Sequence, residues 1–168
     1  ASGTRTMPPE EVKAAAEVDV YRDTYVRFFG YTNELGESFK PLISRWVYLA
    51  SYGVAGVYVI LDAHDKRGKV QLSTGSDVEA NVAGLDALVW QCFASVALPG
   101  FVINRVVSFA GFAVNKITEL PLARRFAPTA VGLLSIPLII QPIDHLVDRA
   151  MDDVYRPLVR SQLGKAPE

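Results

Sequence analysis

The stretch DALVWQCFASVALPGFVINRV, residues 86–106, decides the fold of this 168-residue chain. Its central 18 residues carry no charge, yet they contain the pair Pro99-Gly100 and end beside Arg105. A helix needs ~20 residues, and at least ~17, to cross the ~30 Å hydrocarbon core of a bilayer. The stretch is therefore either a membrane span with a break or a buried helix of a soluble protein that ends at Pro-Gly.

Two further uncharged windows resemble the first, at residues 46–61 and 126–143. Three such windows are hard to bury inside one globule of this size. Apolar residues also continue beyond Pro99-Gly100, as expected for a kinked span, because Pro and Gly are common in membrane helices. The pattern predicts an all-α, multi-spanning membrane protein. We expect the spans near residues 44–62, 84–104 and 126–143.

Amphipathic segments flank these windows and complete the predicted single membrane domain, residues 20–157. Residues 20–40 and 144–157 carry apolar side chains at helical spacing, which predicts helices at the membrane interface or against a partner. Residues 62–86 are polar and include Gly68 and Gly75, so we expect a surface loop there. Residues 106–115 are apolar but too short to cross, which indicates a helical extension or an interfacial piece. Residues 1–19 form a polar N-terminal segment and residues 158–168 a C-terminal tail.

Charges at the window borders predict an orientation. Basic residues near span ends prefer the side of the membrane that is not translocated. If all three windows cross, three arginines fall on one side and three aspartates on the other. We therefore expect the N-terminus and the 105–125 connection on the non-translocated side. The border residues are Arg45, Arg105 and Arg125 on the first side, and Asp62, Asp86 and Asp144 on the second.

Composition and motifs argue against several function classes. A formal net charge of −1 and the lack of a long basic run disfavour nucleic-acid binding. The single cysteine, Cys92, excludes an internal disulfide. His64 and His145 each neighbour an aspartate, but neither belongs to a spaced ligand set. The sequence carries no recognisable nucleotide-binding or metalloprotease motif, so we predict no catalytic, cofactor or metal site.

Two other functions remain open from the residues alone. A small membrane carrier or channel would need polar side chains facing a pathway at mid-depth. The available candidates are Gln91, Ser95, Asn104 and Gln141. A soluble helical-bundle enzyme is the other alternative, and extraction with carbonate would release such a protein from membranes.

Four segments of the chain resemble one known family. They are YRDTYVRFFGYTNELGESF at 21–39, SYGVAGVYVILDAHDK at 51–66, DALVWQCFASVALPGFVINR at 86–105 and PTAVGLLSIPLIIQPIDHLVD at 128–148. In order and composition they resemble the mitochondrial fission process protein 1 family. The similarity extends over most of residues 20–150.

The resemblance implies a non-catalytic, multi-pass protein of the mitochondrial inner membrane, linked to inner-membrane organisation, fission and energy metabolism. It makes the matrix the non-translocated side, so the N-terminus is expected there. The implied partners are membrane lipid and other inner-membrane proteins, such as a respiratory-chain or ATP synthase assembly. The family supplies no catalytic residue, so matching positions are candidates only for contacts within the fold or with a partner or lipid. These are Tyr21, Arg22, Asp23, Asn33, Glu34, Trp90, Pro99, Gly100, Asn104, Arg105 and Asp144.

Overall fold

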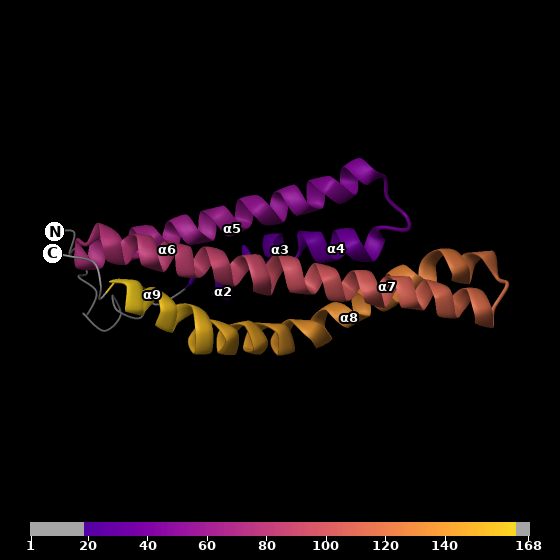
Figure 1. The fold of residues 1–168 in the computed structure, drawn as a ribbon. Coiled ribbons are helices and arrows are strands. Elements are labelled where there is room, and N and C mark those ends of the chain that lie inside the picture. Colours follow the sequence, from indigo (N-terminus) through magenta and orange to yellow (C-terminus); the bar gives the residue numbers. More distant parts are fainter. Residues whose placement is uncertain (1–18, 164–168) are drawn as a thin grey trace, which may run out of the picture.

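Three long helical segments dominate the computed structural model, which describes residues 19–163 (Figure 1). All regular elements in this range are helices, and each long segment is long and apolar enough to cross a membrane. The predicted all-α fold with three candidate spans is therefore confirmed. The first segment is α5 (Arg45–Thr74); the second is α6 (Asp77–Gln91), η1 (Cys92–Ala97) and α7 (Leu98–Ile117); the third is α8 (Pro121–Ala150), η2 (Met151–Tyr155) and α9 (Arg156–Leu163).

The loop predicted for residues 62–86 is wrong. Helix α5 continues to Thr74, and only Gly75 and Ser76 separate it from α6. Gly75 adopts φ 69°, the left-handed conformation that ends a helix and that glycine reaches without strain. The Ser76 side chain then accepts a hydrogen bond from the Glu79 backbone N–H, which caps the start of α6. The polar residues of this segment lie on helices that extend beyond the apolar windows.

The break predicted at Pro99-Gly100 is a local change of helical winding. One π-helical turn, η1, ends two residues before Pro99, and the helix then continues without interruption to Ile117. Proline has no backbone N–H to donate, and its ring crowds the carbonyl four residues earlier. The wider turn makes room for the ring, so that α6 and α7 stay joined in one continuous helical segment. The second π-turn, η2, ends two residues before Pro157 in the same way. Residues 106–115 are thus a helical extension of the second span.

A broken helix precedes the three spans. It comprises α2 (Val20–Asp23), α3 (Arg27–Gly30) and α4 (Thr32–Phe39) and lies alongside α5 (Figure 1). The Tyr58 hydroxyl donates to the Tyr21 carbonyl, and the Tyr52 hydroxyl donates to Glu37, so this segment runs antiparallel to α5. It is helical, as predicted. However, it packs along the spans and also contacts α7 and α8, whereas the sequence suggested a position at the membrane interface or against a partner.

The polarity of α4 and its surroundings is inverted relative to a soluble protein. Seven polar or charged residues in the described part of the chain are buried, four of them in α4, while large apolar side chains cover the outside. Water favours the opposite arrangement, whereas lipid favours apolar side chains outside and polar groups inside. The buried polar residues are Asn33, Glu34, Glu37, Ser38, Asp62, Gln91 and Thr129. The exposed apolar residues of the same broken helix are Val20, Tyr25, Phe28, Phe29, Leu35 and Phe39.

The apolar core lies where α6 and η1 meet the third segment. Trp90 and Ala94 pack against Ile143, Val147 and Met151, which lie on the face predicted to be apolar. The helix predicted for residues 144–157 is therefore present, and it buries Val147 and Met151 of its apolar stripe inside the chain. It continues in α9 to Leu163, past the expected end at residue 157.

The two ends of the bundle differ in which connections they carry. Lys66, close to the α5–α6 turn, forms an ion pair with Asp19, so the first described residue lies at this end. The α4–α5 connection and the α7–α8 hairpin lie at the other end, with the hairpin extending past α5 (Figure 1). The charges at the window borders predicted that the residues before Arg45 lie at the same end of the bundle as Arg45. Asp19 lies at the opposite end, beside Lys66, because the broken helix runs back along the bundle.

Candidate functional site

Glu37 connects three helices at the centre of the polar interior. Its Oε1 accepts hydrogen bonds from the Tyr48 and Tyr52 hydroxyls of α5, at 2.5 and 2.7 Å. Its Oε2 accepts from Asn104 Nδ2 of α7 at 2.8 Å and from Lys40 Nζ at 3.3 Å. The residue is only 3% exposed. Since every lone-pair direction has a donor, this carboxylate can remain charged inside the bundle.

The ionisation of Glu37 follows from these contacts. It lies in α4, outside the three candidate spans. Burial acts to raise its pKa, but the hydrogen bonds from Tyr48, Asn104 and Tyr52, with the charge of Lys40, outweigh burial and lower the pKa. Glu37 is therefore a charged anchor that holds α4 against α5 and α7.

Glu34, three residues earlier in α4, has the opposite environment. It is fully buried, and neither carboxylate oxygen has a hydrogen-bond partner within residues 19–163. Burial, reinforced by the charge of Asp144 and opposed by that of Arg27, raises the pKa of Glu34 to about 8. One short helix thus holds two carboxyl groups, one ionised and one neutral at pH 7.

A second polar cluster joins the first two spans. Gln91 Nε2 donates to Asp62 Oδ2 at 2.6 Å, and both side chains are buried. The Ser95 hydroxyl donates to Gln91 Oε1, and Lys66 pairs with Asp62 at 3.1 Å. Because each of these buried groups finds a partner on the chain, the cluster fixes the register of α5 against α6.

A polar pocket of about 740 Å³ lies beside this cluster, between the broken helix, α6–η1 and α8. Arg27 Nη2 pairs with Asp144 at 3.2 Å, and Trp90 Nε1 donates to Asp148 Oδ1 at 2.7 Å. The lining combines aromatic rings, amides and both signs of charge. It consists of Tyr21, Arg27, Tyr31, Tyr58, Trp90, Gln91, Ala94, Ser95, Pro137, Ile140, Gln141, Asp144, His145 and Asp148.

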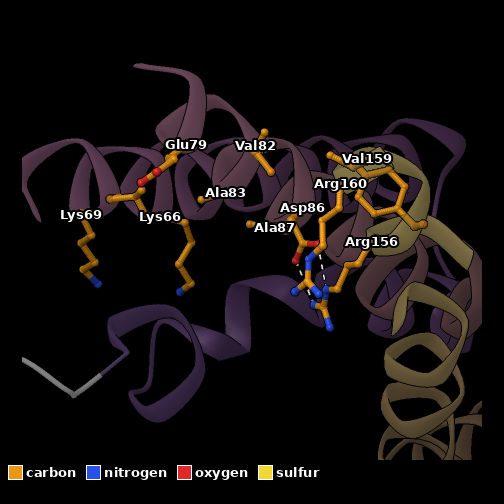
Figure 2. A pocket seen from close by; sticks show the side chains of 12 residues that line it. Lys66, Lys69, Glu79, Val82, Ala83, Asp86, Ala87, Arg156, Val159 and Arg160 are labelled. Carbon is orange, nitrogen blue, oxygen red and sulfur yellow. Dashed lines mark hydrogen bonds and ion pairs between the residues drawn. The ribbon is translucent and has the colours of Figure 1, made fainter. Parts of the chain in front are cut away.

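Another pocket, of about 530 Å³, lies between α5, α6 and α9, towards the α5–α6 turn (Figure 2). Lys66 and Lys69 flank it from α5, and Arg156 and Arg160 from α9. Arg156 forms two hydrogen bonds of 2.9 Å with Asp86, which clamp α9 to α6. Lys66, Lys69 and Arg156 all pair with aspartates of the chain, so their charges are largely compensated.

The structure buries five of the eleven predicted contact residues in the interior. Asn33, Glu34, Trp90, Pro99 and Gly100 are buried. The amide of Asn33 donates to the Val96 carbonyl at 3.3 Å, and Gly100 lies against the Tyr52 hydroxyl. These residues therefore make internal contacts that hold the fold; a role for them in contacts with partners or lipid stays a prediction.

The remaining predicted residues are divided between the pocket, the Glu37 cluster and the surface. Tyr21 and Asp144 line the polar pocket, and Asn104 binds Glu37. Arg105 is exposed on α7, with its guanidinium 5.2 Å from the centre of the Phe101 ring. The side chains of Arg22 and Asp23 lie outside the described part of the structure. Of the carrier candidates, Gln91, Ser95 and Gln141 line the pocket, whereas Asn104 does not.

Sequence reasoning missed the residues that organise the site, above all Glu37, Asp62 and Arg27. Each looked like a solvated charge on an amphipathic segment or at a window border. One usable signal for Glu37 was its position opposite the apolar stripe of residues 20–40, because that polar face turns inward when lipid is outside. His64 and His145 are exposed. Among the described residues no group of three or more His, Cys, Asp or Glu side chains could hold a metal ion.

Comparisons with known proteins point in one direction. The chain matches the family described as mitochondrial 18 kDa protein (MTP18) over residues 16–87 and 63–151. It is 47% identical over 148 residues to the human mitochondrial fission process protein 1, covering 85% of this chain and 89% of the relative. Identity to the Danio rerio protein of that name is 46% over 157 residues, covering 90% and 95%. For the Caenorhabditis elegans protein it is 39% over 155 residues, covering 89% and 92%. No solved structure matches this chain.

Proposed function

The chain belongs to the mitochondrial fission process protein 1 family, and from that premise we propose that it is a non-catalytic structural component of the mitochondrial inner membrane. Its relatives make it a fission-related mitochondrial membrane protein. The observation that carries the proposal is the inverted polarity of the bundle. Its buried polar residues lie inside, where Glu37, Asp62 and Gln91 are hydrogen-bonded, and its apolar residues form an outer surface suited to lipid and to other membrane proteins.

We propose further that the protein acts as an accessory subunit of an inner-membrane assembly, such as a respiratory-chain or ATP synthase complex. The exposed apolar side chains on α5, α7 and α8 offer the contact surface for such a neighbour.

The distribution of charge supports an orientation. Basic residues predominate at the α7–α8 hairpin end, which favours the matrix because a negative potential there stabilises cations by ~2.3 kcal/mol per charge per 100 mV. This orientation places Asp19 on the opposite, intermembrane-space side, which revises the expectation for the N-terminal segment. The charged residues of the hairpin end are Lys40, Arg45, Lys116, Arg124 and Arg125, with the acidic Glu119.

Labelling of single cysteines tests this proposal. In a Cys92→Ala background, Ser73→Cys probes the α5–α6 end and Glu119→Cys the hairpin end. In mitoplasts, a membrane-impermeant maleimide should label the first and should reach the second only after the inner membrane is opened. Labelling in the reverse order would overturn the orientation, and release of the protein by carbonate would overturn membrane embedding.

The role in fission has a separate test. Human cells that lack their own relative should recover normal mitochondrial morphology when they express this chain in the inner membrane. A correctly embedded chain that leaves the morphology of such cells unchanged would contradict the functional part of the proposal.

The polar pocket favours a second candidate, a small solute carrier, because Gln91, Ser95 and Gln141 face it. Flux of a polar solute into liposomes that contain the purified chain would support this candidate. If the flux is the same in liposomes with and without the protein, the carrier candidate is excluded and the structural role is favoured.

A further inference from the structure

Glu34 differs from every other described acid of the broken helix because it is fully buried without a hydrogen bond. Within residues 19–163, neither of its oxygens has a hydrogen-bond partner, and the hydroxyls of Ser38, one turn further along α4, and of Thr129 on α8 also lack one. An unpaired carboxylate is costly to bury, whereas a neutral carboxylic acid is much less so. Glu37 in the same helix has four donors, so the arrangement separates two acids by environment.

The face of the broken helix that carries Glu34 leads to the polar pocket. Arg27, Tyr31 and Glu34 follow one another at spacings of four and three residues, so they lie along one face. Arg27 hydrogen-bonds to Tyr31 and pairs with Asp144 of α8. Arg27, Tyr31 and Asp144 line the pocket, so Glu34 lies one helical turn behind the pocket wall.

We propose that Glu34 is a proton-binding site of the membrane domain, which exchanges its proton with water in the polar pocket past Tyr31. On release, the O–H bond of the carboxylic acid breaks, its electron pair stays on the carboxylate, and the proton passes to a pocket water to give hydronium. Recapture reverses the step. The proposal goes beyond the structural role and does not depend on it.

The groups around Glu34 control this exchange. Arg27 and Tyr31 face it from the preceding turns, and Asp144 faces it from α8. The charge of Arg27 stabilises the carboxylate left behind, and that of Asp144 opposes it. On the sides of α5 and α7, the polar groups of Tyr48, Tyr52 and Asn104 bind Glu37. Glu34 is therefore the neutral, exchangeable acid of α4.

Infrared spectroscopy of the full-length protein in lipid nanodiscs tests this proposal. The wild type should show the C=O stretch of a buried carboxylic acid at neutral pH, and the band should disappear as the pH rises through about 8. Transfer to D₂O should shift the band, because the proton exchanges with pocket water. Glu34→Gln should lose the band, and Glu119→Gln, which removes an exposed acid, should retain it.

A second variant guards against misfolding of the first. Glu34→Met has a similar length and no titratable group, and circular dichroism establishes that each variant is helical. A band that persists in both helical Glu34 variants would overturn the proposal. So would a wild type that lacks the band at neutral pH, or a band that responds neither to pH nor to D₂O.

Discussion

Replacing Glu37 by alanine should destabilise the protein strongly, because this one side chain joins α4 to α5 and α7. Three interior hydrogen bonds are lost, from Tyr48, Tyr52 and Asn104. Side-chain hydrogen bonds in membrane proteins average ~0.6 kcal/mol and reach ~1.7 kcal/mol. The three together therefore contribute ~2–5 kcal/mol. The Lys40 pair adds little, since the Lys40 side chain is 45% exposed.

The assay is reversible unfolding in mixed micelles, followed by the fluorescence of Trp90, which is 6% exposed, in a Trp46→Phe background. Glu119→Ala, at the exposed α7–α8 turn, is the matched control and should change the free energy of unfolding by less than ~0.5 kcal/mol. A double-mutant cycle with Asn104→Ala should give a coupling energy of ~0.6–1.7 kcal/mol. A Glu37→Ala variant as stable as Glu119→Ala would refute the central position of Glu37.

Three further predictions concern packing, charge and pH. Gly132→Leu should destabilise the protein by more than ~2 kcal/mol in the same unfolding assay, because even a Cβ at position 132 would lie 2.6 Å from Val107 Cγ2. Gly53→Leu is the control and should be tolerated, because a Cβ at position 53 would meet no atom within 4 Å. Asp86→Arg should lower the thermal midpoint in detergent by breaking the clamp on Arg156, and adding Arg156→Asp should restore most of it; no recovery would contradict a direct pair. Because Glu34 has a raised pKa when folded, its stabilising contribution is complete below the unfolded pKa and is lost as the pH rises through about 8. The wild type should therefore lose on the order of 4 kcal/mol of stability between about pH 5 and pH 8 relative to Glu34→Gln; parallel pH profiles would contradict a neutral buried acid.

The spans were predictable because hydropathy measures how favourably a segment transfers from water into the apolar core of a bilayer. The windows at residues 46–61, 87–104 and 126–143 all lie within long helices, and their helical state does not depend on details of packing. The polar extensions were not predictable in the same way. A polar segment that contains glycines suits a loop and an exposed helix equally well, and the structure shows that only Gly75 and Ser76 leave the helical conformation.

The candidate site was predictable in part. The stripe from Tyr21 to Phe39 correctly indicated a helical segment, but periodicity does not say which face is inside. In water the apolar face would turn inward, and in lipid it turns outward, so Glu34 and Glu37 change from solvated charges to interior groups. The donors to Glu37 lie 11, 15 and 67 residues further along the chain, and local patterns carry no information about such pairings.

Collision measurements on one spin label at position 35 test the inverted bundle most directly. In a Cys92→Ala background, a nitroxide on Leu35→Cys reports the apolar face of α4, and one on Glu119→Cys reports the exposed hairpin turn. In lipid bilayers, the label at position 35 should collide more often with oxygen, which concentrates in lipid, than with a water-soluble nickel chelate. The label at position 119 should show the reverse. If the label at position 35 collides mainly with the nickel chelate, the apolar face of the broken helix does not face lipid, and the account of the fold is wrong.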